Sequence, residues 1–138
     1  MSLLNPHPRC ASYDTTGRPC RRRVQRWGDR CNRCWEQLVR SESVAHRMQL
    51  AQELTIPAAA RQRLVVDQVM AVRMSMASRP DLSGPDQMAL AQDDQVAVLR
   101  ALASNPRLAP ELRSSLSAHH DPLVRANLML SGSASARS

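Results

Sequence analysis

The chain has 138 residues, which is enough for one ordinary domain or for a small module followed by a larger one. It contains no lysine and no phenylalanine, and its 19 arginines against 12 acidic residues give a formal charge of +7, which favours an anionic partner. No apolar stretch is long enough to span a bilayer, and no secretory signal is recognisable, so we expect a cytoplasmic protein without a membrane partner.

The positive charge is concentrated at the N-terminal end. Residues 1–47 carry ten arginines against four acidic residues, whereas residues 48–138 carry nine against eight. The three aromatic residues, Tyr13, Trp27 and Trp35, also lie within the first 35 residues. The sequence therefore divides into a basic, aromatic N-terminal segment and a nearly neutral remainder.

Four cysteines fall inside the basic segment, at Cys10, Cys20, Cys31 and Cys34. The last two have the C-x2-C spacing that lets one tight turn present two thiolates to one ion, and Gly17 with its neighbours favours a turn before Cys20. In a reducing compartment, clustered cysteines bind metal more often than they form disulfides. We therefore predict a closed zinc site with these four ligands. A [4Fe–4S] cluster, a disulfide pair and unconnected thiols stay open as alternatives.

The segment CASYDTTGRPCRRRVQRWGDRCNRCW resembles a small zinc-binding module of phage and bacterial proteins. The pattern of that module is a cysteine, a T-x-x-G-x-x-C turn, basic residues, a glycine and a final C-x2-H. Cys34 stands here where histidine is usual. The resemblance implies metal binding. A segment with so few apolar side chains would also need the metal to fold, because zinc contributes on the order of 10–16 kcal/mol to such modules.

Seven arginines and one tryptophan surround the cysteines: Arg18, Arg21, Arg22, Arg23, Arg26, Trp27, Arg30 and Arg33. One interpretation is a solvated face that partly neutralises the negative charge of a four-thiolate zinc site. The second is a nucleic-acid surface, in which the arginines contact phosphates and Trp27 stacks on a base. An acidic protein partner is a third interpretation, and the sequence does not separate it well from nucleic acid.

The segment after the cysteines, WEQLVRSESVAHRMQLAQEL (35–54), predicts one continuous helix that starts at the C-x2-C pair. Beyond it, apolar residues recur every 26 positions. Five columns keep this register: Leu50, Met76, Leu102 and Leu128; Ala51, Ala77, Ala103 and Met129; Val72, Val98 and Val124, with His46 first; Ile56, Leu82 and Leu108; Leu64, Leu90 and Leu116. A fixed short period is typical of a solenoid, and Pro80 and Pro106 predict two short helices in each unit.

The pattern V-x-x-x-L-A-x-N-P-x-L, best kept at residues 98–118, resembles the leucine-rich-repeat-variant family of HEAT-like α-solenoids. This resemblance implies helical repeats over residues 46–130. Members of that family can carry an N-terminal cysteine module with a [4Fe–4S] cluster, which is the best argument for iron here. Their cysteines are packed more tightly than C-x9-C-x10-C, and that departure favours zinc.

The expected architecture is all-α: a metal module (1–35), a solenoid of about four repeats (36–130) and a disordered tail (131–138). No nucleophile–base pair, phosphate loop or pair of carboxylates stands out, so we do not expect an enzyme. The leading hypothesis is a zinc-containing nucleic-acid-binding protein. A protein–protein adaptor and an iron–sulfur redox or sensing protein are the alternatives, and self-association at the apolar residues of 123–130 is a further expectation.

Overall fold

The computed structural model describes residues 11, 18–22 and 30–135, and its regular structure over these residues is helical. The helices are α1 (Asn32–Val39), α2 (Val44–Ala51), α3 (Ala58–Leu64), α4 (Met70–Ala77), α5 (Gly84–Ala91), α6 (Val96–Ala103), α7 (Pro110–Ser117) and α8 (Pro122–Ser135). Most have eight residues, which corresponds to about 12 Å at ~1.5 Å per residue. The predicted all-α class is therefore confirmed.

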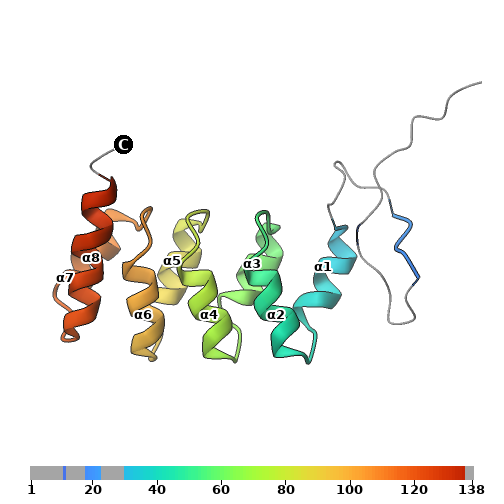
Figure 1. The fold of residues 1–138 in the computed structure, drawn as a ribbon, viewed down its shortest axis with the longest axis horizontal. Coiled ribbons are helices and arrows are strands. Elements are labelled where there is room, and N and C mark those ends of the chain that lie inside the picture. The colour runs from blue at the N-terminus through green and yellow to red at the C-terminus, as the bar shows by residue number, and fades with distance from the viewer. Residues whose placement is uncertain (1–10, 12–17, 23–29, 136–138) are drawn as a thin grey trace, which may run out of the picture.

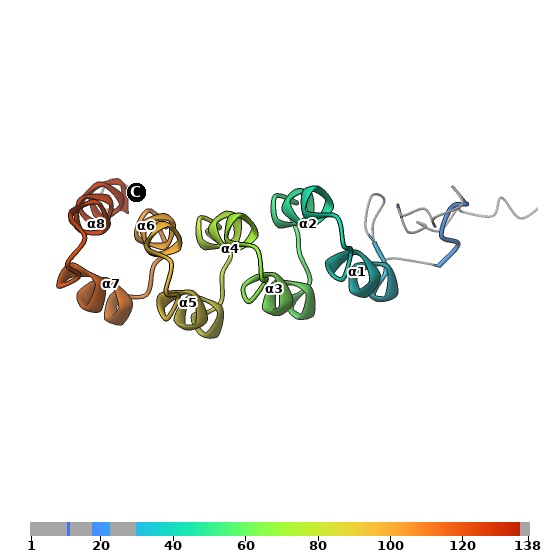
Figure 2. The same cartoon turned by 90° about the horizontal axis from the view of Figure 1, so that it is seen from below.

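The helices form two layers in a single row (Figures 1 and 2). The even-numbered helices α2, α4, α6 and α8 pack side by side in one layer, and the odd-numbered helices line the other. Successive helices of the even layer begin 26 residues apart, at Val44, Met70, Val96 and Pro122. The 26-residue period in the sequence is thus the spacing between stacked helix pairs, and the predicted solenoid is confirmed.

The columns read from the sequence form the core. Val72, Val98 and Val124 are completely buried, and so are Leu64 and Leu90. The alanine column is equally buried in its first three copies, where the small side chain lets neighbouring helices of the even layer approach closely. No unit buries its apolar face alone, so the stack is stabilised by contacts between neighbours.

The prediction of one helix over 35–54 was wrong. α1 ends at Val39 and α2 begins at Val44, because the hydroxyl of Ser43 caps α2 by accepting a hydrogen bond from the His46 N–H at 3.4 Å. The break extends the 26-residue register one helix earlier than expected, since α3 begins 26 residues after α1. The repeat architecture therefore starts inside the segment that we had assigned to the metal module.

Two further expectations need correction. His46 is exposed rather than partly buried, because it lies on α2, the first helix of the even layer in the described residues. The predicted tail also begins too early, since α8 continues to Ser135. Ser131 is buried and donates to the carbonyl of Ala103 at 2.9 Å, which fixes this extension against α6. Residues 136–138 of the expected tail lie outside the described residues.

A column of polar side chains joins successive units at the ends of the even-layer helices. Three of them donate to the last carbonyl of the preceding helix in that layer: Arg79 to Ala51 at 2.9 Å, Asn105 to Ala77 at 3.2 Å and Ser131 to Ala103 at 2.9 Å. The last carbonyls of a helix have no partner within it, so each unit satisfies backbone acceptors of the unit before it. We call these three side chains the carbonyl ladder.

Candidate metal centre and arginine surface

Three of the four predicted ligands meet at the start of α1. Cys31 is the N-cap residue of α1 and Cys34 lies in its first turn, while Cys20 comes from the preceding loop. Their sulfur atoms all lie within 4.8 Å of one another, and the three side chains are half-buried. Cys10, the fourth predicted ligand, lies outside the described residues. The structure thus brings together a cluster that can hold a metal ion.

The cluster fits a metal better than a disulfide. The Sγ atoms of Cys20 and Cys31 are 3.9 Å apart. Tetrahedral zinc with Zn–S bonds of ~2.3 Å places its sulfur ligands about 3.8 Å apart. A disulfide requires about 2.05 Å. The partial positive charge at the N-terminus of α1 also favours the negative charge of thiolate ligands.

A single arginine connects the metal cluster to the repeats. Arg30 precedes Cys31, and its guanidinium group forms an ion pair with Glu53, in the connection between α2 and α3, at 2.7 Å. The same guanidinium carbon lies 5.5 Å from the ring centroid of Trp35, which is buried in α1. Arg30 is therefore engaged within the molecule, and we exclude it from the predicted nucleic-acid surface.

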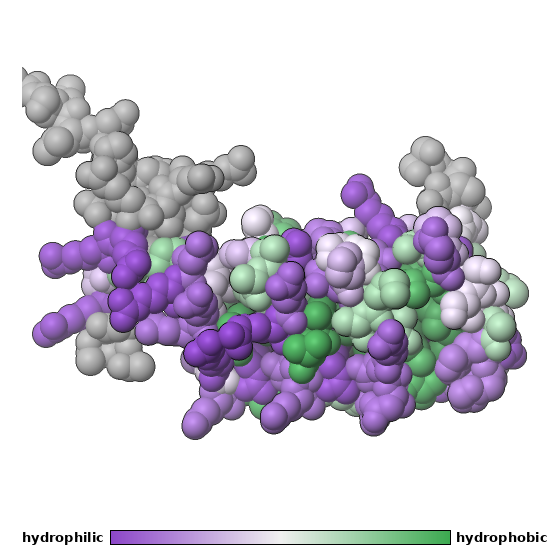
Figure 3. Space-filling model, turned by 180° about the vertical axis from the view of Figure 1, so that it is seen from behind, coloured by the Kyte–Doolittle hydropathy of each residue, from purple (hydrophilic) through white to green (hydrophobic). Residues whose placement is uncertain are grey.

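The other predicted surface residues fall into two groups. Arg18, Arg21, Arg22 and Arg33 are exposed, and hydrophilic side chains gather at this end of the molecule (Figure 3). Arg23, Arg26 and Trp27 lie outside the described residues, so their predicted roles stay predictions. Among the described residues, Arg22 and Arg33 form no side-chain ion pair or hydrogen bond.

Arginines in the repeats mostly have partners within the molecule. Three of them pair with an aspartate about 20 positions later: Arg47 with Asp67 at 2.7 Å, Arg73 with Asp93 at 2.6 Å and Arg100 with Asp121 at 2.6 Å. Each aspartate also accepts a backbone N–H at the start of the next even-layer helix. We had not identified these pairs from the sequence, although the 26-residue spacing of the first two was visible in it.

The pairs hold their carboxylates in the ionised form. Burial alone would raise the pKa of Asp93, but hydrogen bonds from Arg73 and from the Gln95 N–H outweigh it, so this pKa lies below its usual value. The hydrogen bond from Arg100 likewise lowers the pKa of Asp121 well below its usual range. The arginines of these pairs are therefore neutralised at neutral pH, which leaves the unpaired positive charge mainly at the N-terminal end.

Comparison with known proteins adds no relative from which a function could be transferred. No family model matches the chain, and no curated protein or solved structure is significantly similar to it. Within the described residues, none of the helices has the length and apolar character needed to cross a membrane.

Proposed function

We propose that this protein is a non-enzymatic binding protein in which a structural zinc ion, held by Cys10, Cys20, Cys31 and Cys34, orders an arginine-rich end. That end contacts the phosphate backbone of nucleic acid, and the helical repeats form its scaffold. The pattern of four cysteines favours zinc, and the 3.9 Å separation of two sulfur atoms supports tetrahedral thiolate coordination. The resemblance to leucine-rich-repeat-variant proteins stays part of the proposal and keeps a [4Fe–4S] cluster as the alternative.

The observation that carries the proposal is the division of the arginines into two classes. Those of the repeats are largely used in ion pairs and in bonds to backbone carbonyls, as Arg73 and Arg79 illustrate. At the N-terminal end, by contrast, Arg22 and Arg33 are exposed and lack such partners among the described residues. A guanidinium group without an internal partner can donate to a phosphate at little cost in stability, and its planar fork suits bidentate contact.

The test is the salt dependence of nucleic-acid binding. Each phosphate that an arginine neutralises releases counterions, so affinity should fall steeply as salt rises. Arg22→Ala with Arg33→Ala should reduce the slope of log affinity against log salt by about 0.7 per lost contact on a single strand. Arg107→Ala is the matched control, because Arg107 is also exposed and unpaired among the described residues but lies between α6 and α7.

Two outcomes would count against the proposal. Failure of the full-length protein to bind any nucleic acid at low salt would reject it. Equal effects of the control and of the double substitution would show that only net charge matters. If Trp27 stacks on bases, Trp27→Ala should weaken binding to a single strand by about 1–3 kcal/mol and affect duplex less.

A protein–protein adaptor is the second candidate function. Several large apolar side chains on the repeats are exposed, among them Met88 at 54% and Met129 at 75%. Such side chains suit contact with another protein when they are grouped. An adaptor would bind its partner through the repeats, so substitution of Arg22 and Arg33 would leave that binding intact.

A further inference from the structure

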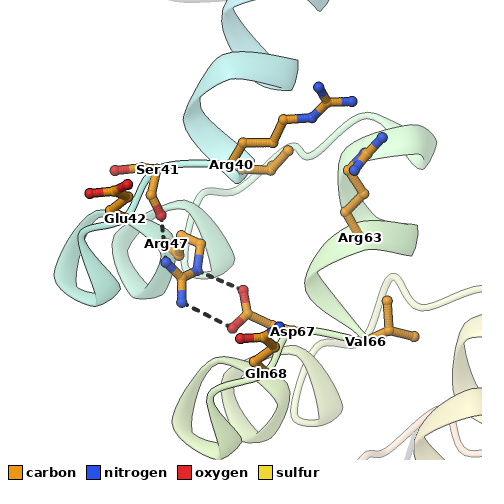
Figure 4. A pocket seen from close by; sticks show the side chains of 9 residues that line it. Arg40, Ser41, Glu42, Arg47, Arg63, Val66, Asp67 and Gln68 are labelled. Carbon is orange, nitrogen blue, oxygen red and sulfur yellow. Dashed lines mark hydrogen bonds and ion pairs between the residues drawn. The ribbon is translucent and has the colours of Figure 1, made fainter.

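An open hollow lies beside the metal module, between the first three helices. Its volume is about 500 Å³, within the range of roughly 300–1,000 Å³ that is usual for ligand sites. The end of α1 contributes Val39 and Arg40, the end of α3 contributes Arg63, and Val66 follows α3 (Figure 4). The lining is thus partly apolar and partly cationic.

Not every charge in this hollow is available to a ligand. Arg47 and Asp67 neutralise each other through two hydrogen bonds of 2.7 and 3.2 Å, and Arg47 also donates to the carbonyl of Ser41. Arg40 and Arg63 are exposed, and within the described part of the chain their side chains have no hydrogen-bond or ion-pair partner. In the view of Figure 4 their guanidinium groups end on one side of the hollow and the carboxylate of Glu42 on the other.

The two arginines are not part of the repeat pattern. Arg47 and Arg73 occupy equivalent positions one unit apart, and both pair with an aspartate. The positions equivalent to Arg40 in later units are Val66, Gln92 and Ala118, and those equivalent to Arg63 are Ala89 and Ser115. The solenoid is therefore built without a cation at these two positions in its later units, so fold construction does not explain Arg40 and Arg63.

We propose that this hollow is a second phosphate-binding site, in which Arg40 and Arg63 hold a phosphodiester group of the nucleic-acid strand. The inference rests on the proposed function and extends the contact surface from the metal module onto the repeats. Two guanidinium groups from different helices can contact one phosphate from two directions. The apolar surface of Val66, which is 67% exposed, offers a contact for the adjoining sugar or base.

The hollow lies on a path from the metal module. Arg33 precedes Arg40 by seven residues, or about two helical turns, so both lie on the same side of α1. A strand bound at Arg22 and Arg33 would reach Arg40 and Arg63 by following α1. Contacts on both segments would give a longer binding site than the metal module provides alone.

The experiment compares three variants of the full-length, metal-loaded protein: Arg40→Ala with Arg63→Ala, Arg22→Ala with Arg33→Ala, and Arg107→Ala. Binding to a fluorescently labelled single strand is measured by anisotropy over a range of salt concentrations. For the hollow variant we expect the salt slope to fall by about 0.7 for a single shared phosphate and by about 1.4 for two. Metal content and the thermal midpoint should not change, because neither side chain has a partner to lose.

The outcomes separate the two proposals. A smaller slope for the hollow variant, with no change for Arg107→Ala, supports the second site. A slope unchanged in the hollow variant but reduced in the module variant overturns the second site and leaves the proposed function standing. Absence of binding by the unmodified protein overturns both. Equal changes in the hollow variant and in Arg107→Ala also overturn the second site, because they would reflect net charge alone.

Discussion

The carbonyl ladder makes Asn105 the residue whose loss should be felt most strongly among the polar side chains of the repeats. Asn105 is completely buried, and its amide nitrogen donates to the carbonyls of Ala77 at 3.2 Å and Arg79 at 2.6 Å. Its carbonyl oxygen accepts from the Arg107 N–H at 2.9 Å. Asn105→Ala removes all three hydrogen bonds. At about 0.5–1.5 kcal/mol net for each bond, and with groups left buried without partners, we expect a loss of about 2–4 kcal/mol.

Urea unfolding followed by far-ultraviolet circular dichroism measures this loss. Asn105→Leu keeps most of the volume but no polar atom, so it should be as destabilising as the alanine variant if hydrogen bonding is the cause. Ser104→Ala is the control, since Ser104 is exposed and its variant should stay within about 0.5 kcal/mol of the parent. A stability of Asn105→Ala equal to that of the control would refute the role assigned to the ladder. Recovery of stability in Asn105→Leu would attribute the effect to packing instead.

Three other predictions concern the metal, the core and the ion pairs. Elemental analysis of anaerobically purified protein should give one zinc ion per chain, and Cys34→Ser should lose the metal while the repeat helices persist; stoichiometric iron with sulfide would contradict the zinc assignment. Leu102→Ala removes a completely buried side chain and should cost about 2–5 kcal/mol in urea unfolding, and a negligible loss would place Leu102 outside the core. Because the pKa of Asp93 is lowered in the folded state, its stabilising contribution should be present above pH ~4 and should be lost as pH falls through the folded-state value. Asp93→Asn should therefore lose less stability over that acidic range, and parallel curves for variant and parent would contradict this.

The repeating part of the fold was predictable because its signal is local and periodic. Leu50, Met76 and Leu102 follow one another at 26 residues, and burial on one helix face requires apolar side chains at these positions. The first helix pair escaped prediction because Trp35 and Leu38 also continue smoothly into the apolar positions of the next helix. Only the cap formed by Ser43 reveals the break, and a serine in a polar stretch is a weak signal.

The site was predictable where it depends on spacing and unpredictable where it depends on pairing. The C-x2-C pair and Cys20 identified the metal cluster, since nearby cysteines can be brought together by one turn. Which arginines are available is decided instead by contacts over 20 or more residues, as between Arg30 and Glu53. Arg40 and Arg63 gave no signal either, because they flank a hollow that exists only once α1 and α3 are packed.

The carbonyl ladder has a direction, and this matters while the chain is being made. The donors in Arg79, Asn105 and Ser131 all reach backward, toward carbonyls of the unit that precedes them in the sequence. A unit leaving the ribosome therefore has acceptors that only the next 26 residues can satisfy, a delay of about 1–5 s at ~5–20 residues per second. During that interval the newest even-layer helix has open carbonyls at its end and an uncovered apolar side. The growing edge of the solenoid is thus the part most exposed to chaperones and to mispairing with another nascent chain.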